Sequence, residues 1–415
     1  MSEPTTLTLD EARLHPAEDL AGPRRNALIA AVIGLAATAA GYMFLGPETF
    51  FLSYWTAWIY WLGAPLGLFM FCLLTHVSGG RWGVMMHRVQ ITAGKTIPLF
   101  FLLGLPVIFA GGMEVLFPWT RPEAAADALV LEKTGYLKLW FGFEGPNPDW
   151  MTALPGFIPR YFLFFAIWTL WAFRISALAK KHDETGDEKY KTLQQRWSSG
   201  GLVVFTLVAT FASIDWIMST DPHWFSSLYG PQFMLWQALT AISLSIPLLI
   251  FFSNRQPLDR IIRRKHFHDY GKLMLAFTMV WGYFSVSQFL IIWSANLPEE
   301  VPWYLYRNTP GWQYYTIAVT VFTFFVPFLI LLSQDIKFKP KILMRVAILI
   351  LVVRWFDYYW QMAPNLHHDG VSLHLFDIAP MIGIGGLWLW IFLGQLGGVT
   401  VPIHEQEIKE ALADG

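Results

Sequence analysis

Residues 50–74 read FFLSYWTAWIYWLGAPLGLFMFCLL and contain no Asp, Glu, Lys or Arg. About 20 predominantly apolar residues in an α-helix are enough to cross the hydrocarbon core of a bilayer. Inside that core every backbone N–H and C=O needs an internal partner, and a helix supplies all of them within one segment. This stretch therefore predicts a membrane-spanning helix.

Apolar stretches of this kind recur along the chain and predict ten membrane spans, so the expected fold is an all-α polytopic membrane protein. The spans are expected near Asn26–Leu45, Phe50–Leu74, Gly83–Gly111, Phe157–Ala179, Gly200–Met218, Gln232–Phe252, Leu273–Ser294, Tyr314–Leu332, Ile342–Met362 and Phe376–Gly397. Prolines inside the spans predict kinks, which membrane helices tolerate when neighbours re-satisfy the backbone; they are Pro65, Pro98, Pro106, Pro247, Pro327 and Pro380.

The composition agrees with a membrane protein. Hydrophobic residues make up 55%, charged residues 14%, and the mean hydropathy is +0.42, whereas a soluble domain carries about 25% charged residues. The net charge of −1 gives no reason to expect a nucleic-acid partner. The single cysteine, Cys72, excludes a disulfide framework, a cysteine-ligated iron–sulfur cluster held by this chain alone and a Cys-rich zinc site.

Basic residues gather in alternate connections between the spans. The connections after spans 4, 6 and 8 hold Lys180, Lys181, Lys189, Lys191 and Arg196, then Arg255, Arg260, Arg263, Arg264 and Lys265, then Lys337, Lys339 and Lys341. Because cytoplasmic loops carry the excess of Lys and Arg, both termini are expected in the cytoplasm. The first span, 26–45, is interpreted as an anchor, since its apolar run exceeds a signal-peptide core of about 7–15 residues.

A weak internal repeat suggests how the spans are grouped. Asp215-Trp216 precedes Pro222 by the spacing with which Asp357-Tyr358 precedes Pro364. We therefore expect a membrane domain over 26–400, with a first bundle over 50–218, a second over 232–362 and flanking helices at 26–45 and 376–397. Residues 1–25 and 401–415 form cytoplasmic ends. The long outer loop, 112–156, is either a functional cover or an interfacial cap.

Ionisable residues inside spans are costly and are functional candidates by default. Arg354 and Asp357 lie at i and i+3 in span 9, where they can pair. The pair is either a structural element or part of a proton path or polar wall. Asp215 lies about one turn inside the outer interface, and Lys95 lies deep in span 3, where it either snorkels or conducts protons.

The histidines and aromatic residues complete the candidate set. His87 is the deepest histidine and has no deep partner in the expected topology, so no haem held between two helices is expected. Asp221 and His223 either border a quinone cleft or form an Asp-Pro turn and a solvated loop. The rings of Trp216, Trp224 and Tyr358 either form the walls of that cleft or anchor the protein at the interface.

Three motifs carry a resemblance to a known family: SIDWIMSTDPHWFSSLYG at 213–230, FSVSQFLIIWSANLPEE at 284–300 and RWFDYYW at 354–360. With them the chain resembles the quinone-type membrane subunits of bacterial alternative complex III, in the polysulfide-reductase C-chain (NrfD-like) superfamily. The resemblance covers nearly the whole chain. The length of this chain is similar to that of the smaller of the two such subunits in the complex, which is often termed the F subunit.

The resemblance implies a function in the bacterial inner membrane as part of a quinol:cytochrome c oxidoreductase complex. The substrate would be menaquinol or ubiquinol. Haem c and iron–sulfur clusters would lie in partner subunits, with no metal ligand or covalent cofactor in this chain. The implied partners are a sister quinone-type subunit, an iron–sulfur subunit, multihaem cytochrome c subunits and a terminal oxidase. The main quinol pocket is expected in the sister subunit.

Three functions stay open from the residues alone. The chain either surrounds a quinol site and moves protons, with Asp215, Arg354, Asp357, Lys95 and His87 on the proton path, or it is a structural scaffold of the complex. The third alternative is a secondary transporter, which would also use buried charges and kinked spans.

Overall fold

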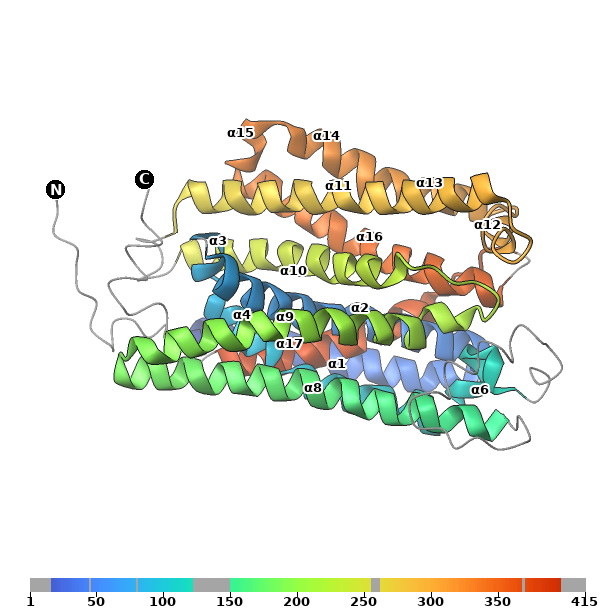
Figure 1. The fold of residues 1–415 in the computed structure, drawn as a ribbon, viewed down its shortest axis with the longest axis horizontal. Coiled ribbons are helices and arrows are strands. Elements are labelled where there is room, and N and C mark those ends of the chain that lie inside the picture. The colour runs from blue at the N-terminus through green and yellow to red at the C-terminus, as the bar shows by residue number, and fades with distance from the viewer. Residues whose placement is uncertain are drawn as a thin grey trace.

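The computed structural model describes residues 16–44, 46–79, 81–121, 150–254, 262–367 and 370–396. Over these residues the chain forms helices and no strand. The long helices run side by side along the longest axis of the molecule (Figure 1). The protein is therefore an all-α polytopic membrane protein of about ten helices, as the sequence predicts.

Within the described residues, nine helices are long and apolar enough to cross a membrane. They include α1 (Pro16–Phe44), α2 (Gly46–Ser78), α8 (Trp150–Thr185), α9 (Glu188–Trp216), α10 (Tyr229–Ser253), α11 (Arg264–Ala295) and α17 (Ile378–Leu396). The ninth expected span, near Ile342–Met362, is α16 (Pro340–Leu366), a helix of 27 residues that is not among these nine. It carries Arg345, Arg354 and Asp357 within an otherwise apolar run, and its length is sufficient for a crossing.

Two of the expected spans are interrupted. The third is divided into α3 (Arg81–Val84), α4 (His87–Gly94) and α5 (Ile97–Phe109), and the eighth into α13 (Trp312–Thr320), a π-helix η5 (Val321–Phe325) and α14 (Val326–Leu332). Pro98 and Pro327 lie just after the breaks, where a missing N–H and a restricted preceding residue disfavour a regular helix. At the first break, Trp388 Nε1 of α17 donates to Thr96 Oγ1 at 2.8 Å.

Helix α2 is the centre of the molecule. It is buried along most of its length and packs against α4, α5, α9, α10, α16 and α17. Gly67 permits the closest of these approaches, because a Cβ there would lie 2.1 Å from the backbone oxygen of Gln237 on α10. The backbones of α2 and α10 therefore meet without an intervening side chain, as in other close helix pairs in membranes.

The two expected flanking helices, α1 and α17, pack closely against each other. A Cβ on Gly34 would lie 2.3 Å from the backbone N of Gly383, so this contact also depends on glycine. In Figure 1 α11, α13, α14 and α16 lie on one side of α10, and α1, α8, α9 and α17 lie on the other. Since α10 contacts α2 and α9 across the expected boundary, the division into two bundles stays a prediction.

Shorter elements close the end at which α6 lies in Figure 1. They are α6 (Gly112–Leu116), η1 (Pro118–Thr120), η3 (Met218–Thr220), α12 (Pro302–Tyr306) and η6 (Leu375–Asp377), while α15 (Gln334–Lys337) lies near the opposite end. Much of the long loop, including Glu123, Asp127, Trp140, Glu144 and Asp149, lies outside the described residues. So do most of the expected cytoplasmic ends, 1–25 and 401–415.

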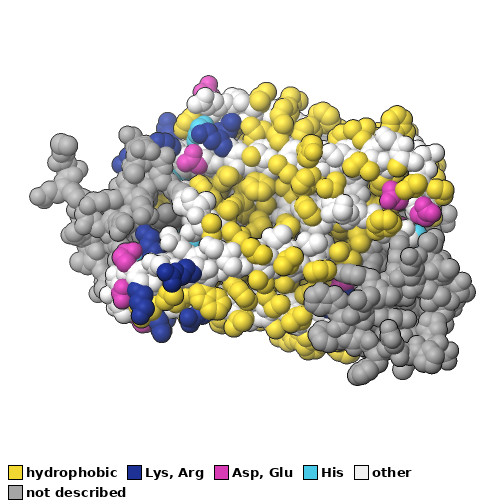
Figure 2. Space-filling model, in the orientation of Figure 1, with side chains coloured by type: hydrophobic (Ala, Val, Ile, Leu, Met, Phe, Trp, Pro, Cys, Tyr) yellow, Lys and Arg dark blue, Asp and Glu magenta, His cyan; other side chains and the backbone are white. Residues whose placement is uncertain are grey.

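The described surface is sorted by chemistry along the long axis. Hydrophobic side chains cover the middle of the molecule, and Lys and Arg gather at one end, near the hairpin between α8 and α9 (Figure 2). An apolar belt bounded by a basic end is what a bilayer with a cytoplasmic leaflet requires. Which end faces the cytoplasm stays a prediction.

Candidate functional site

The first feature of the site is the predicted pair on α16. Arg354 Nη2 donates to Asp357 Oδ2, and Trp281 Nε1 of α11 donates to the same oxygen at 3.2 Å. The guanidinium also lies over the Trp281 ring, with 5.6 Å between Cζ and the centroid. Both charged residues are buried, at 0% exposure for Arg354 and 1% for Asp357. The sequence spacing thus correctly identifies the pair, and the structure adds Trp281.

Part of the Arg354 guanidinium has no hydrogen-bond partner, although the whole side chain is buried. Its Nε and Nη1 atoms have no hydrogen-bond partner among the described residues. A buried donor without a partner costs about 1–3 kcal/mol, and more when it is charged. Such groups in a native protein indicate a bound water or another small molecule. Whether the pair is a structural element or part of a proton path or polar wall stays a prediction.

Asp357 also lines a large cavity between α11, α12, α13, η5 and α16. The cavity has a volume of about 1170 Å³, at or above the upper end of the range for small-molecule sites, about 300–1,000 Å³. Its walls are mainly apolar and aromatic. A few polar side chains interrupt them, namely Gln232, Gln288, Asn308, Gln313, Thr316 and Gln361. Apolar walls with a small number of placed polar groups are typical of ligand sites.

Stacked aromatic rings and one arginine form the end of the cavity near the short outer helices. Trp224 stacks on Trp303 with ring centroids 4.6 Å apart, and Trp360 meets Trp303 edge to face at 5.3 Å. Arg307 Cζ lies 3.5 Å from the Trp303 centroid, and its Nη2 donates to the backbone oxygen of Gln361 at 2.7 Å. Burial lowers the pKa of Arg307 to about 9, so this arginine stays charged at neutral pH.

The cavity reaches the lipid-facing surface of the protein. Several of its lining side chains are also exposed, among them Tyr283, Val286, Phe289 and Trp293 of α11 and Ile317 of α13. Phe324 of η5 packs against α11 at Gly282. A Cβ added to Gly282 would lie 2.5 Å from the Phe324 ring. A π-helix is rare and is frequent at functional sites. The cavity is therefore open on the side that carries these exposed apolar side chains of α11 and α13.

The second buried acid, Asp215 on α9, belongs to a separate place in the fold. Arg160 of α8 binds its carboxylate with two nitrogens, Nε to Oδ2 at 2.7 Å and Nη2 to Oδ1 at 3.1 Å. Both side chains are 1% exposed. Sequence reasoning missed Arg160 as the partner, although a lone arginine inside an apolar span is a signal that could have found it. Bidentate pairing makes a structural role the simpler interpretation.

The residues predicted to form a quinone cleft are not gathered in one place. Trp224 lines the cavity. Trp216 instead packs on Trp58 and Phe165 in the first bundle, and Tyr358 packs on Trp236. Neither they nor Asp221 and His223 line the cavity as the described residues define it. Asp221 Oδ1 accepts from the backbone N of His223 at 3.1 Å, which is the turn that an Asp-Pro sequence favours.

Lys95 lies half-buried at the break between α4 and α5, inside the third span. His87 nevertheless has a histidine neighbour, because His76 Nε2, in the last turn of α2, lies 2.5 Å from His87 Nε2. The sequence does not predict this contact, because the two residues are on different helices, α2 and α4. Cys72 completes a cluster with these two histidines.

Comparison with known proteins adds no assignment for this arrangement. A scan against models of protein families finds no match to the chain, and a search of curated proteins finds none either. The resemblance to the membrane subunits of alternative complex III therefore stays a prediction.

Proposed function

We propose that this chain is a membrane subunit of a quinol:cytochrome c oxidoreductase complex, and that its lipid-facing cavity binds quinol beside Asp357. The observation that carries the proposal is the position of the Arg354–Asp357 pair at the wall of an apolar cavity that opens between two lipid-facing helices. A quinol has an apolar tail and ring with two hydroxyl groups, which suits such a cavity.

In the proposed reaction, quinol is oxidised to quinone and gives up two electrons and two protons. The carboxylate of Asp357 accepts one proton, and Trp281 and Arg354 hold that carboxylate in place. Positioned proton acceptors of this kind contribute about 10²–10⁴-fold to a rate. The second proton would leave to solvent, and the two electrons would need an acceptor outside this chain, for which an iron–sulfur cluster of a partner subunit is proposed.

The aromatic end of the cavity would orient the quinol ring. Trp303 and Trp360 offer flat faces and edges to a ring. Arg307, held between them, brings a positive charge near one side of the cavity. The proposed partners are a sister quinone-type subunit, an iron–sulfur subunit and multihaem cytochrome c subunits, in the bacterial inner membrane with both termini cytoplasmic.

The test is quinol:cytochrome c reductase activity of the purified complex carrying Asp357→Asn. We expect turnover to fall by about 10²-fold or more, since the amide cannot accept the proton. Subunit content is checked by gel. Asp335→Asn is the matched control, because Asp335 is exposed on α15 and does not line the cavity, and its turnover should equal that of the parent.

Unchanged turnover of Asp357→Asn in an intact complex would overturn the proposal and favour a scaffold. A second measurement addresses binding directly. A photoreactive quinone analogue should label peptides of α11 and α13 in the parent, and excess quinol should compete with it. Labelling confined to the sister subunit contradicts a quinol site in this chain. Uptake of a solute by vesicles containing the chain alone would instead favour a transporter.

A further inference from the structure

A cluster of metal-ligating side chains lies far from the cavity, at the end of the molecule where α3 and α4 meet α2. Cys72 and His76 are at i and i+4 on α2, so they share one face of that helix. His87 is the first residue of α4. One ligand atom from each of the three side chains lies within 4.8 Å of the others.

Two glycines bring His87 back over α2. Gly79 follows the end of α2 with a φ of +59°, a conformation that disfavours other residues. Gly83 then packs directly on α2, where a Cβ would lie 2.1 Å from Thr75 Oγ1. The chain reverses within a few residues as a result. The cluster is thus held by backbone geometry on rigid helices, which is what a metal site requires.

Hydrogen bonding directs the free nitrogen of His76 toward His87. His76 Nδ1 lies 2.7 Å from Ser198 Oγ on α9, which leaves Nε2 to face His87 Nε2 at 2.5 Å. A ligating histidine commonly uses its second ring nitrogen in this way, because that bond fixes the tautomer and the ring orientation. Two imidazole nitrogens this close either share a hydrogen, with one ring donating its N–H to the lone pair of the other, or both turn lone pairs toward a metal ion.

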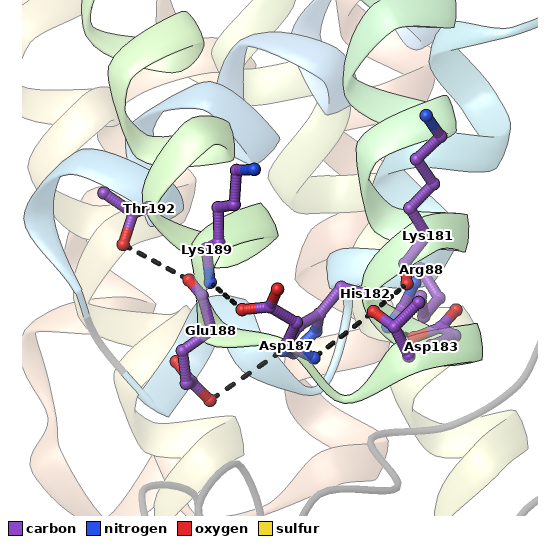
Figure 3. Close-up of polar contacts among 9 residues, drawn as sticks. Arg88, Lys181, His182, Asp183, Asp187, Glu188, Lys189 and Thr192 are labelled. Atoms are coloured by element: carbon purple, nitrogen blue, oxygen red, sulfur yellow. Dashed lines mark hydrogen bonds and ion pairs between the residues drawn. The ribbon is translucent and has the colours of Figure 1, made fainter.

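Three groups that carry or can carry positive charge lie near His87, namely Arg88, His182 and Lys191, and acids of the α8–α9 hairpin pair with the first two. Arg88, which follows His87, pairs with Asp183 of α8. His182 Nε2 lies 3.8 Å from Glu188 Oε1. Figure 3 shows these contacts meeting at the turn between α8 and α9, with Lys181 directed away. The acids therefore reduce the repulsion that a metal ion would meet near His87.

We propose that Cys72, His76 and His87 bind a copper ion. One thiolate and two imidazoles are the trigonal set that copper favours, and a thiolate selects Cu(I) over harder ions. In the divalent state copper also binds a given site more tightly than zinc, in the ordinary affinity series. The ion would separate the two imidazole nitrogens to about 3.3–3.5 Å, as metal–nitrogen bonds of about 2.0–2.1 Å require. The ion would join α2 to α4. Ser198 of α9 would hold the His76 ring in place through its hydrogen bond with Nδ1.

The test uses the full-length purified chain and Cu(I) supplied in competition with a bicinchoninate chelator. We expect one copper per chain. Cys72→Ala and His87→Ala should each weaken binding by more than about 100-fold, because even second-shell changes cost about 10–100-fold. Ser198→Ala should fall in that smaller range. His223→Ala is the matched control, since His223 is exposed at the other end of the protein, and it should bind as the parent does.

A second measurement needs no variant and so does not depend on their folding. X-ray absorption of the copper-loaded parent should show one sulfur and two nitrogen neighbours. A parent chain that leaves copper with the chelator would overturn the proposal. So would a spectrum without sulfur, or equal binding by Cys72→Ala and the parent. Any of these outcomes would leave His76 and His87 as a hydrogen-bonded pair between two helices. None of these outcomes depends on quinol oxidation.

Discussion

At the residue scale, each buried charge discussed above lies against an opposite charge or a set of acceptors. Arg160 holds Asp215 between α8 and α9, Arg354 holds Asp357 within α16, and Arg307 donates to backbone and amide oxygens. Removing one partner of a buried pair is strongly destabilising, because it leaves an uncompensated charge in an apolar surrounding. The two acid pairs therefore share the same energetic constraint.

The Arg160–Asp215 pair gives a prediction about stability. Arg160→Met should lower the free energy of unfolding by about 3–5 kcal/mol, since Asp215 is then buried alone. The double variant Arg160→Met/Asp215→Leu should recover most of the loss, because apolar side chains of similar size can replace a buried pair. Thermal unfolding in detergent measures both. If Arg160→Met were as stable as the parent, the result would mean that water reaches Asp215.

At the scale of helices, the closeness of packing depends on individual glycines. Along α2, Gly67 and Gly63 lie one turn apart and face the same region of α10 and α16, yet their surroundings differ. A Cβ on Gly67 would lie 2.1 Å from a backbone oxygen, whereas one on Gly63 would lie 3.5 Å from Tyr358 Oη, an ordinary contact. Only a side chain at position 67 would force the backbones of the two helices apart.

This difference predicts opposite results for two similar substitutions. Gly67→Ala should lower the free energy of unfolding by about 1–3 kcal/mol, because it overpacks the contact between α2 and α10. Gly63→Ala should be neutral or stabilise the protein by up to about 1 kcal/mol, since Ala is the better helix former. Unfolding curves of the two variants in the same detergent provide the comparison. Equal losses in the free energy of unfolding for the two variants would mean that the close contact of α2 with α10 at Gly67 does not contribute specifically to stability.

At the scale of the whole molecule, the distribution of charge predicts how the protein sits in the membrane. The basic end includes Lys180, which is exposed next to the α8–α9 hairpin. Ser227 is exposed in the loop before α10, at the opposite end. The positive-inside rule assigns the first to the cytoplasm and the second to the outer side. The single native cysteine, Cys72, is buried, so it should not interfere with labelling of introduced cysteines.

The orientation can be tested with Lys180→Cys and Ser227→Cys. A maleimide that does not cross membranes should label the cysteine at 227 in intact spheroplasts. It should label the cysteine at 180 only after the cells are opened. The parent chain, with Cys72 alone, is the control and should stay unlabelled in both conditions. The reverse pattern would place both termini on the outer side and would move the cavity to the cytoplasmic leaflet.

Much of this arrangement could be predicted from the amino-acid sequence, because hydropathy and charge spacing are local properties. The long apolar stretches determine the helices and the membrane class. The spacing of Arg354 and Asp357 determines their pairing, since residues at i and i+3 are neighbours on any helix. The interruptions near Pro98 and Pro327 follow from the chemistry of proline. Each of these features needs only a few consecutive residues.

The tertiary structure was needed for contacts between residues that are far apart along the chain. Arg160 meets Asp215 across two helices, and His76 meets His87 after a chain reversal that depends on Gly83. The cavity likewise exists only where α11, the π-helix of span eight and α16 come together. Helix packing selects such contacts through side-chain shape and glycine positions on several helices at once. Hydropathy along a single helix does not contain that information.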